Sequence, residues 1–158
     1  MPNSSAGVLL YRRTAAGLNV LLAHPGGPFW SNRDVGAWQI PKGLILTGEN
    51  PAAAAAREFE EELGVPITGK MRPLGGIKQA GGKQVEAFAV EQALDPSAIV
   101  SNEFNMEWPP RSGRIHAYPE IDQARWFTIP EAETMMLPSQ RPLLDRLIAL
   151  VDRRPEDD

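Results

Sequence analysis

The stretch from Gly43 to Val65, GLILTGENPAAAAAREFEEELGV, decides the fold of this chain. Asn50 is a suitable N-cap, Pro51 suits a first helical position, and a run of alanines, the best helix formers, follows. Gly64 is a suitable residue to end the helix. The stretch therefore predicts a helix over Pro51–Leu63, and apolar residues at helical spacing predict its buried face as Ala52, Ala56, Phe59 and Leu63.

The last turns of this helix are acidic. Glu58, Glu61 and Glu62 are three and four residues apart, so they share one face and repel each other by about 0.2–0.5 kcal/mol per pair. The C-terminal end of a helix also prefers cations. A divalent cation such as magnesium, which takes carboxylate oxygens, would reverse this penalty. An ordinary solvated acidic face is the plain alternative.

The spacing upstream favours the metal site. The pattern reads Gly43, five residues, Glu49, seven residues, then Arg57-Glu58-Phe59-x-Glu61-Glu62-x-Gly64-Val65. It resembles the signature of the Nudix hydrolases at every specified position. The resemblance implies an α/β/α sandwich with a mixed β-sheet, and the alternation of strand and helix patterns favours a layered α/β (α+β) class independently.

The resemblance also implies a reaction. Members of the family hydrolyse a phosphoanhydride (pyrophosphate) bond in a nucleoside diphosphate linked to another group, such as a nucleoside triphosphate or a dinucleoside polyphosphate. We therefore expect a magnesium-dependent pyrophosphatase, with manganese as an alternative metal. The implied metal ligands are the Gly43 carbonyl and the carboxylates of Glu58, Glu61 and Glu62.

The same resemblance suggests the catalytic residues. Glu61, or an acid from a late loop, would take the proton of the attacking water. Glu120 is the first choice for that late acid and Glu107 the second. Arg57 would orient the glutamates by salt bridges, and Glu49 would brace the loop and the start of the helix.

Substrate residues are expected in two further segments and beside the signature stretch Gly43–Val65, which we call the box. The loop Pro25–Ala37 carries Trp30, for which core cover and base stacking are equally good interpretations. Lys42 precedes the box and is a candidate phosphate ligand. The segment Asp95–Asp122 has little periodicity, yet its aromatic residues and its arginines Arg111 and Arg114 suit base stacking and phosphate pairing. The alternative there is a long surface loop pinned by its own apolar side chains.

Substrate identity stays open. The residues that distinguish ADP-ribose and dinucleoside polyphosphate enzymes in the family are missing from Gln79–Lys83. One rival hypothesis is a nucleotide-binding sensor of the same fold without catalysis, although the glutamate set is complete. Another is a structural acidic helix in an unrelated fold. An RNA 5′-end pyrophosphohydrolase is disfavoured by the net charge of −4, which makes nucleic acid an unexpected partner.

Length and composition set the remaining expectations. The 158 residues predict one domain over residues 1–154, with a frayed acidic tail at 155–158. The chain has no cysteine, and we find no apolar run of membrane-spanning length and no signal peptide, so we expect a soluble cytoplasmic protein, monomer or homodimer. The apolar Leu44–Leu46 segment should be covered, a second subunit being one candidate. Expected strands are Ser5–Tyr11, Leu18–His24, Trp38–Ile40, Met71–Gln79, Gln84–Glu91 and Arg125–Phe127, and further helices are Pro130–Met136 and Ser139–Arg153.

Overall fold

The two apolar runs near the N-terminus pair at the centre of a sheet. β1 (Ser4–Thr14) and β2 (Gly17–Pro25) are antiparallel, as expected. The computed structural model describes residues 4–79 and 82–152. The expected acidic tail and part of the turn at residues 80–83 therefore lie outside the described residues.

The sheet is mixed. Its main path runs β4 (Arg72–Lys78), β5 (Gln84–Glu91), β1, β2 and β8 (Ile121–Thr128), and the short β3 (Lys42–Leu44) pairs with β1. β1 and β5 run parallel, whereas the other pairs are antiparallel. The expected mixed sheet is confirmed.

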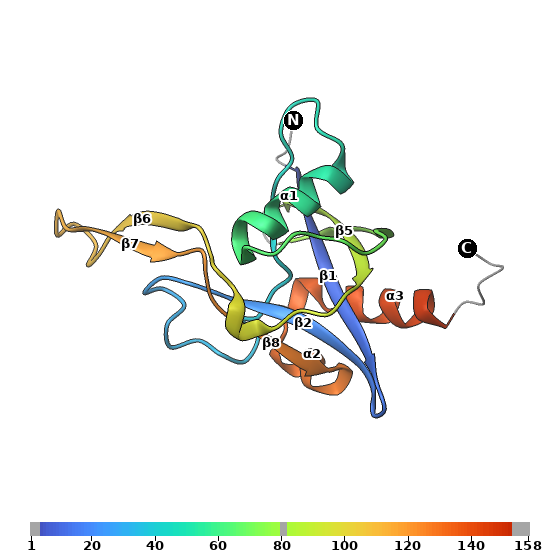
Figure 1. Cartoon of the computed structure of the whole chain (residues 1–158). Helices are drawn as coiled ribbons and strands as arrows, with labels where there is room; N and C mark the ends of the chain where they lie inside the picture. Colours follow the sequence, from blue (N-terminus) through green and yellow to red (C-terminus); the bar gives the residue numbers. More distant parts are fainter. Residues whose placement is uncertain (1–3, 80–81, 153–158) are drawn as a thin grey trace.

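Helices cover both faces of the sheet (Figure 1). On one face Ala6, Val8 and Leu10 of β1 pack in a core with α1 (Pro51–Leu63). On the other face Leu9 and Tyr11 pack in a core with α2 (Ile129–Met135) and α3 (Pro142–Val151). Because successive side chains of a strand point to opposite faces, this double burial explains why β1 reads as a nearly continuous apolar run. The α/β/α sandwich is confirmed.

Helix α1 begins and ends where the sequence predicts. The Asn50 side chain accepts hydrogen bonds from the first-turn amides, and Gly64 ends the helix in a left-handed conformation. The buried face differs from the prediction, because Ala54 and Ala55 are fully buried with Phe59 and Leu63. A run of identical alanines carries no contrast between faces, so only packing could decide which of them are covered.

Several predicted elements are altered. Trp38–Ile40 makes only isolated bridges, from Trp38 to Met136 and from Gln39 to Ala23, and the strand begins later, at Lys42. The expected long C-terminal helix is divided into a 3₁₀ turn, η3 (Pro138–Gln140), and α3. Another 3₁₀ turn, η2, covers Pro96–Ala98. Within the described ranges, no helix is long and apolar enough to cross a membrane.

The largest departure from the sequence prediction is a projecting hairpin. β6 (Glu103–Glu107) and β7 (Ile115–Pro119) form a separate two-stranded sheet, which extends from the body at the left of Figure 1. We call β6, β7 and the turn between them the arm. The alternative of a long surface loop is wrong for these two strands. The sequence holds a signal for the strand, since Phe104, Met106 and Trp108 alternate with polar residues.

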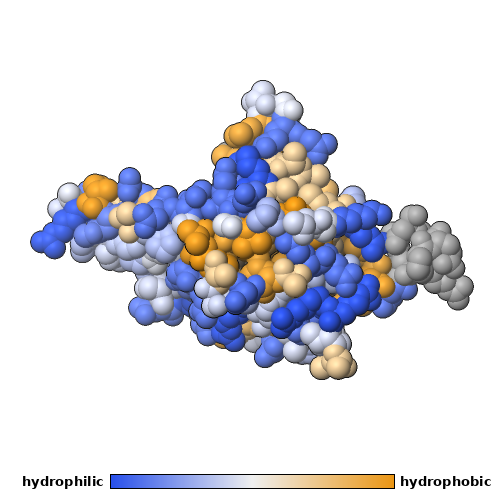
Figure 2. Space-filling model, viewed as in Figure 1, coloured by the Kyte–Doolittle hydropathy of each residue, from blue (hydrophilic) through white to orange (hydrophobic). Residues whose placement is uncertain are grey.

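The Leu44–Leu46 segment is only partly covered. Ile45 packs against the core under α1, but Leu44 and Leu46 are 54% and 55% exposed. Figure 2 shows hydrophobic surface near the top of the molecule, where the loop into α1 lies in Figure 1. The expected cover over these two leucines is not provided by the described part of the chain.

Candidate active site

Arg57 organises the acidic end of α1. Its guanidinium donates two parallel hydrogen bonds to Glu49, at 2.8 and 2.9 Å. It also donates to Glu58 at 2.9 Å and to Glu61 at 3.2 Å. A further bond, to the carbonyl of Leu44, occupies its remaining side. The guanidinium therefore orients three carboxylates and ties the loop before the helix to the helix, as the sequence predicts for Arg57 and Glu49.

The charges of this cluster support each other. The paired hydrogen bonds from Arg57 lower the pKa of the Glu49 carboxyl to about 2. Glu49 in turn raises the pKa of the Arg57 guanidinium above its ordinary value. Both groups are thus ionised at neutral pH.

Glu62 lies on the inner side of the acidic face. Its carboxylate accepts a hydrogen bond of 3.0 Å from the Lys42 amide, which links α1 to β3. Burial, and then the charge of Glu58, raise the pKa of the Glu62 carboxyl to about 8. Ionising the Glu62 carboxyl therefore costs free energy unless a cation binds next to it.

Glu120 reaches the same place from the other end of the chain. It lies between the arm and β8, and its amide donates to the Asn102 carbonyl at 2.7 Å. Partial burial and the charge of Glu58 raise the pKa of the Glu120 carboxyl. Asn102 in turn donates its amide to the Glu61 carbonyl at 3.2 Å, which fixes the base of the arm to the end of α1.

Two cavities meet at these residues. One, of about 310 Å³, is lined by Trp30, Gln39 and Ile40 among others, and the second, of about 400 Å³, by Glu58, Glu61 and Asn102 among others. Both include Lys42, Glu62 and Glu120 in their walls. The structure thus brings together eight of the residues that the sequence singled out: Trp30, Lys42, Gly43, Arg57, Glu58, Glu61, Glu62 and Glu120.

Lys42 places a cation among these acids. Burial lowers the pKa of its ammonium group, while the neighbouring Glu62 and Glu58 carboxylates oppose that change. An amine next to carboxylates in the wall of both cavities suits contact with a phosphate group.

The backbone register defines how β3 faces the site. Gly43 lies opposite Ala6 in the antiparallel ladder, and two residues away the Ile45 amide donates to the Ser4 carbonyl. Hydrogen-bonded pairs recur at every second residue of such a ladder, so the Gly43 carbonyl faces β1. The expected ligand role of that carbonyl has no support in this register.

Gly43 contributes space instead. A Cβ at this position would overlap the carboxylate of Glu58. The Lys42 carbonyl, one residue earlier, points away from β1 and therefore toward the side of α1. The absence of a side chain at Gly43 leaves a cradle in which the Glu58 carboxylate lies.

The set of donors fits a divalent cation with oxygen ligands. Three carboxylates and a backbone carbonyl are ligands that magnesium takes, and the raised pKa of Glu62 reflects its burial first and the nearby charge of Glu58 second. Among the described residues, however, the acidic and histidine side chains do not already converge as a group of three around one point. The Arg57 guanidinium binds Glu58 and Glu61, whereas Glu62 accepts from the Lys42 amide instead.

Three other candidates lie elsewhere. Arg111 and Arg114 lie at the tip of the arm and outside the walls of both cavities. Glu107 also lies on the arm, where its carboxylate accepts from the amides of Arg111 and Gly113. Glu107 therefore stabilises a turn, and Glu120 is the late acid that the fold brings to the site.

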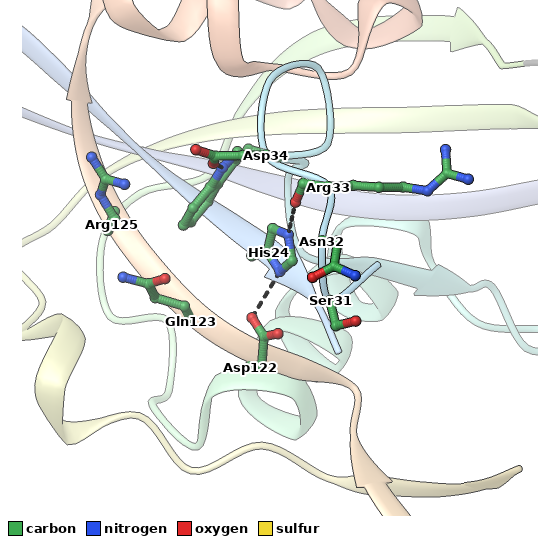
Figure 3. Close-up of a pocket in the computed structure, with 9 residues that line it drawn as sticks. His24, Ser31, Asn32, Arg33, Asp34, Asp122, Gln123 and Arg125 are labelled. Carbon is green, nitrogen blue, oxygen red and sulfur yellow. Dashed lines mark hydrogen bonds and ion pairs between the residues drawn. The ribbon is translucent and has the colours of Figure 1, made fainter. Parts of the chain in front are cut away.

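A third, larger cavity lies on the face of the sheet that carries α2 and α3. It has a volume of about 580 Å³, and Figure 3 shows His24 at its floor, between the loop residues 31–34 and the β8 residues 122–125. His24 contacts Asp122 through Nδ1 at 2.8 Å and the Arg33 carbonyl through Nε2. This cavity includes none of the box glutamates, so its size does not make it the reaction site.

Sequence reasoning missed two residues that shape the site. Gln140 is fully buried, and its Oε1 accepts from the Ile40 amide at 2.9 Å, which positions the chain just before Lys42. Asn102 links α1 to Glu120, as described above. Neither residue carries a local signal, because each acts through a partner distant in the sequence.

Comparison with known proteins agrees with this geometry. The sequence model of the family described as NUDIX domain matches residues 1–147. An RNA pyrophosphohydrolase of Rhodospirillum rubrum is 27% identical over 94% of this chain and 91% of its own length. An octanoyltransferase of Myxococcus xanthus is 35% identical over 61% of this chain, but the match spans only 24% of that protein.

A solved structure gives the same fold. The chain is similar to an Ap4A hydrolase of C. elegans, crystallised as a binary complex, with a TM-score of 0.66. The likeness covers 93% of this chain and 97% of that protein at 19% sequence identity. At that identity the comparison bears on the fold alone.

Proposed function

The chain belongs to the NUDIX domain family, and on that premise we propose that it is a divalent-metal-dependent hydrolase that cleaves a phosphoanhydride bond in a nucleotide-type substrate. The observation that carries the proposal is the convergence of the α1 glutamates with Glu120 on cavities that also include Lys42. Carboxylates and an amine in one place suit phosphates bridged by a cation.

Each of these residues has a separate role in the proposed reaction. Glu58, Glu61 and Glu62, with the Lys42 carbonyl, would hold magnesium, and manganese would use the same oxygens. When bound, the metal supplies Lewis-acid charge to the phosphates and acidifies water. The Lys42 ammonium contacts a phosphate oxygen, and Trp30 lies against the nucleoside.

Glu120 and Glu61 are the candidates for proton acceptor. Glu120 is suited to that role, because the raised pKa of its carboxyl makes it a stronger proton acceptor. Arg57 does not contact the substrate. It keeps Glu58 and Glu61 in position against their mutual repulsion.

A second candidate function is removal of phosphates from the 5′ end of RNA. It is favoured by the relative named RNA pyrophosphohydrolase, which aligns with nearly the whole chain. The net charge of −4 opposes broad contact with a polynucleotide but not local contact at one charged face.

The test is product analysis with magnesium. The panel contains nucleoside triphosphates, oxidised triphosphates, ADP-ribose, dinucleoside polyphosphates and 5′-triphosphorylated RNA. We expect hydrolysis of one class, with kcat reduced about 100-fold or more in Glu62→Gln. Glu60→Gln is the matched control, since Glu60 is an exposed glutamate on the same helix. Magnesium-dependent nucleotide binding without hydrolysis of any substrate would favour the sensor hypothesis instead.

A further inference from the structure

We propose that the arm is the binding surface for the nucleotides that follow the first in a single-stranded RNA bearing a 5′-triphosphate. The proposal rests on the proposed function, because the scissile phosphates must lie at the glutamate cluster. It adds a second contact region outside both cavities. It also assigns a role to a hairpin that forms a sheet of its own, separate from the main sheet.

The two faces of the arm differ in chemistry. Residues paired across the ladder share a face, and alternate residues of one strand do so as well. One face therefore carries aromatic, thioether and cationic side chains and no carboxylate: Phe104, Met106, Trp108, Arg114, His116 and Tyr118. The opposite face carries Glu103 and Glu107.

Three rings of this face form a row. The ring centroids of Phe104 and Tyr118 are 6.0 Å apart, and those of Tyr118 and His116 are 6.2 Å apart. Trp108 extends the row to the tip, where its amide bonds the Arg114 carbonyl at 2.9 Å. Rows of this kind bind single strands, because every base has a face that stacks on an aromatic ring.

This row begins at the candidate active site. Its first ring, Phe104, packs on Gly27, where a Cβ would lie 3.0 Å from the ring. Gly27 belongs to the loop that carries Trp30, a residue of the cavity wall. Glu120 directly follows β7, and its carbonyl accepts from the Gly26 amide at 2.9 Å. A chain that leaves the cavity beside Trp30 therefore meets Phe104 and Tyr118 next.

The tip offers cations without partners. Among the residues that the structure describes, the guanidinium groups of Arg111 and Arg114 make no hydrogen bond or ion pair. Arg114 is six residues from Glu120, a distance of about 20 Å along a strand. A mononucleotide held at the glutamates is too short to reach these groups, whereas a short oligonucleotide can.

The charge of the arm points to a polyanion on one side only. By the register, Arg114 lies on the face of the aromatic row, while the Glu107 carboxylate accepts hydrogen bonds from the amides of the turn. A polynucleotide can therefore follow this face although the whole chain is acidic.

The experiment measures how KM depends on RNA length. Substrates are 5′-triphosphorylated RNAs of one to four nucleotides, with magnesium. We expect KM to fall about tenfold or more from one to four nucleotides. In the double variant Trp108→Ala with His116→Ala that length dependence should disappear. The matched control is Asn105→Ala with Ile115→Ala, on the opposite face, which should keep it.

Three results would overturn the proposal. The first is a KM that does not depend on RNA length in the unaltered protein. The second is an equal loss of that length dependence in the control variant. The third is an aromatic variant that changes the hydrolysis of a dinucleoside polyphosphate but not that of RNA. Binding of a labelled RNA tetranucleotide, followed by fluorescence anisotropy in the same variants, separates this from the proposed function. RNA binding that depends on the arm, without hydrolysis, would reject the proposed function but not the arm proposal. Hydrolysis with a KM that does not depend on RNA length would reject the arm proposal but not the proposed function.

Discussion

Arg57 and Glu49 form a two-bond pair, at 2.8 and 2.9 Å, that joins the loop before α1 to the acidic end of that helix. Both side chains are mostly buried, with exposed fractions of 27% and 18%. Such a pair has a fixed planar geometry, which a lysine cannot reproduce. The arrangement of the carboxylates that we propose as metal ligands therefore depends on a residue outside that set.

The first prediction concerns this pair. Arg57→Lys keeps the charge but loses the paired bond, so we expect the free energy of unfolding to fall by about 1–2 kcal/mol and kcat to fall about tenfold. Arg146→Lys is the matched control, because the Arg146 guanidinium binds two carbonyls of β4 away from the glutamates. Urea unfolding and steady-state kinetics of both variants measure this. An unchanged kcat in Arg57→Lys would remove the orienting role.

The second prediction concerns pH. The Glu62 carboxyl has a pKa of about 8 in the folded protein against an ordinary value of 4.5, so between these values the folded state holds the extra proton. Without metal, this group makes stability decrease as pH rises through that window. Magnesium must displace the proton, so its affinity should fall about tenfold per pH unit below pH 8.

Calorimetry tests this proton linkage. Titrations of magnesium at pH 6.5, in buffers of different ionisation enthalpy, should report release of close to one proton. Glu62→Gln removes the titratable carboxyl and should therefore abolish this proton release. Equal magnesium affinity at pH 6.5 and 8.5 in the unaltered protein would contradict the assignment.

The third prediction concerns Gly7, which lies where β1 supports β3. A Cβ on Gly7 would lie 2.6 Å from the Pro41 carbonyl and 2.8 Å from the Lys42 Cβ. We expect Gly7→Ala to lower the free energy of unfolding by about 1–3 kcal/mol and to weaken magnesium binding, because β3 must shift. Gly76→Ala is the control, since its nearest atom is the end of the flexible Glu86 side chain at 3.2 Å. Thermal unfolding with and without magnesium compares the two variants.

The fourth prediction concerns His24. Its two ring nitrogens face the Asp122 carboxylate and the Arg33 carbonyl, and both of these groups accept. His24→Leu should cost about 1–2 kcal/mol of stability, because the loop at Arg33 loses its tie to β2. Asp122→Asn should cost much less, since the amide oxygen can still face the ring and the tie from His24 to the Arg33 carbonyl is kept. Urea unfolding of both variants measures the difference, and equal losses would contradict this prediction.

Local signals predicted the helix of the box and its caps without error. Asn50, Pro51 and Gly64 act on the backbone within a few residues, so their effect does not depend on the rest of the fold. The alternation of Phe104, Met106 and Trp108 with polar residues is equally local, but both faces of the arm are largely exposed, so no buried face distinguishes this strand from a loop. The direction in which the Gly43 carbonyl points depends on the register between β1 and β3, which no local pattern predicts.

By itself, the sequence determined the family signature, the helix that carries Glu58, Glu61 and Glu62, and the class of fold, since each depends on residues close together in the chain. The tertiary structure alone decided that Glu120 and Asn102 meet that helix, that Gln140 positions the segment before Lys42, and that Arg111 and Arg114 lie on an arm. Those outcomes depend on contacts between residues that are distant in sequence. Such contacts arise only when the sheet brings separate segments to one edge.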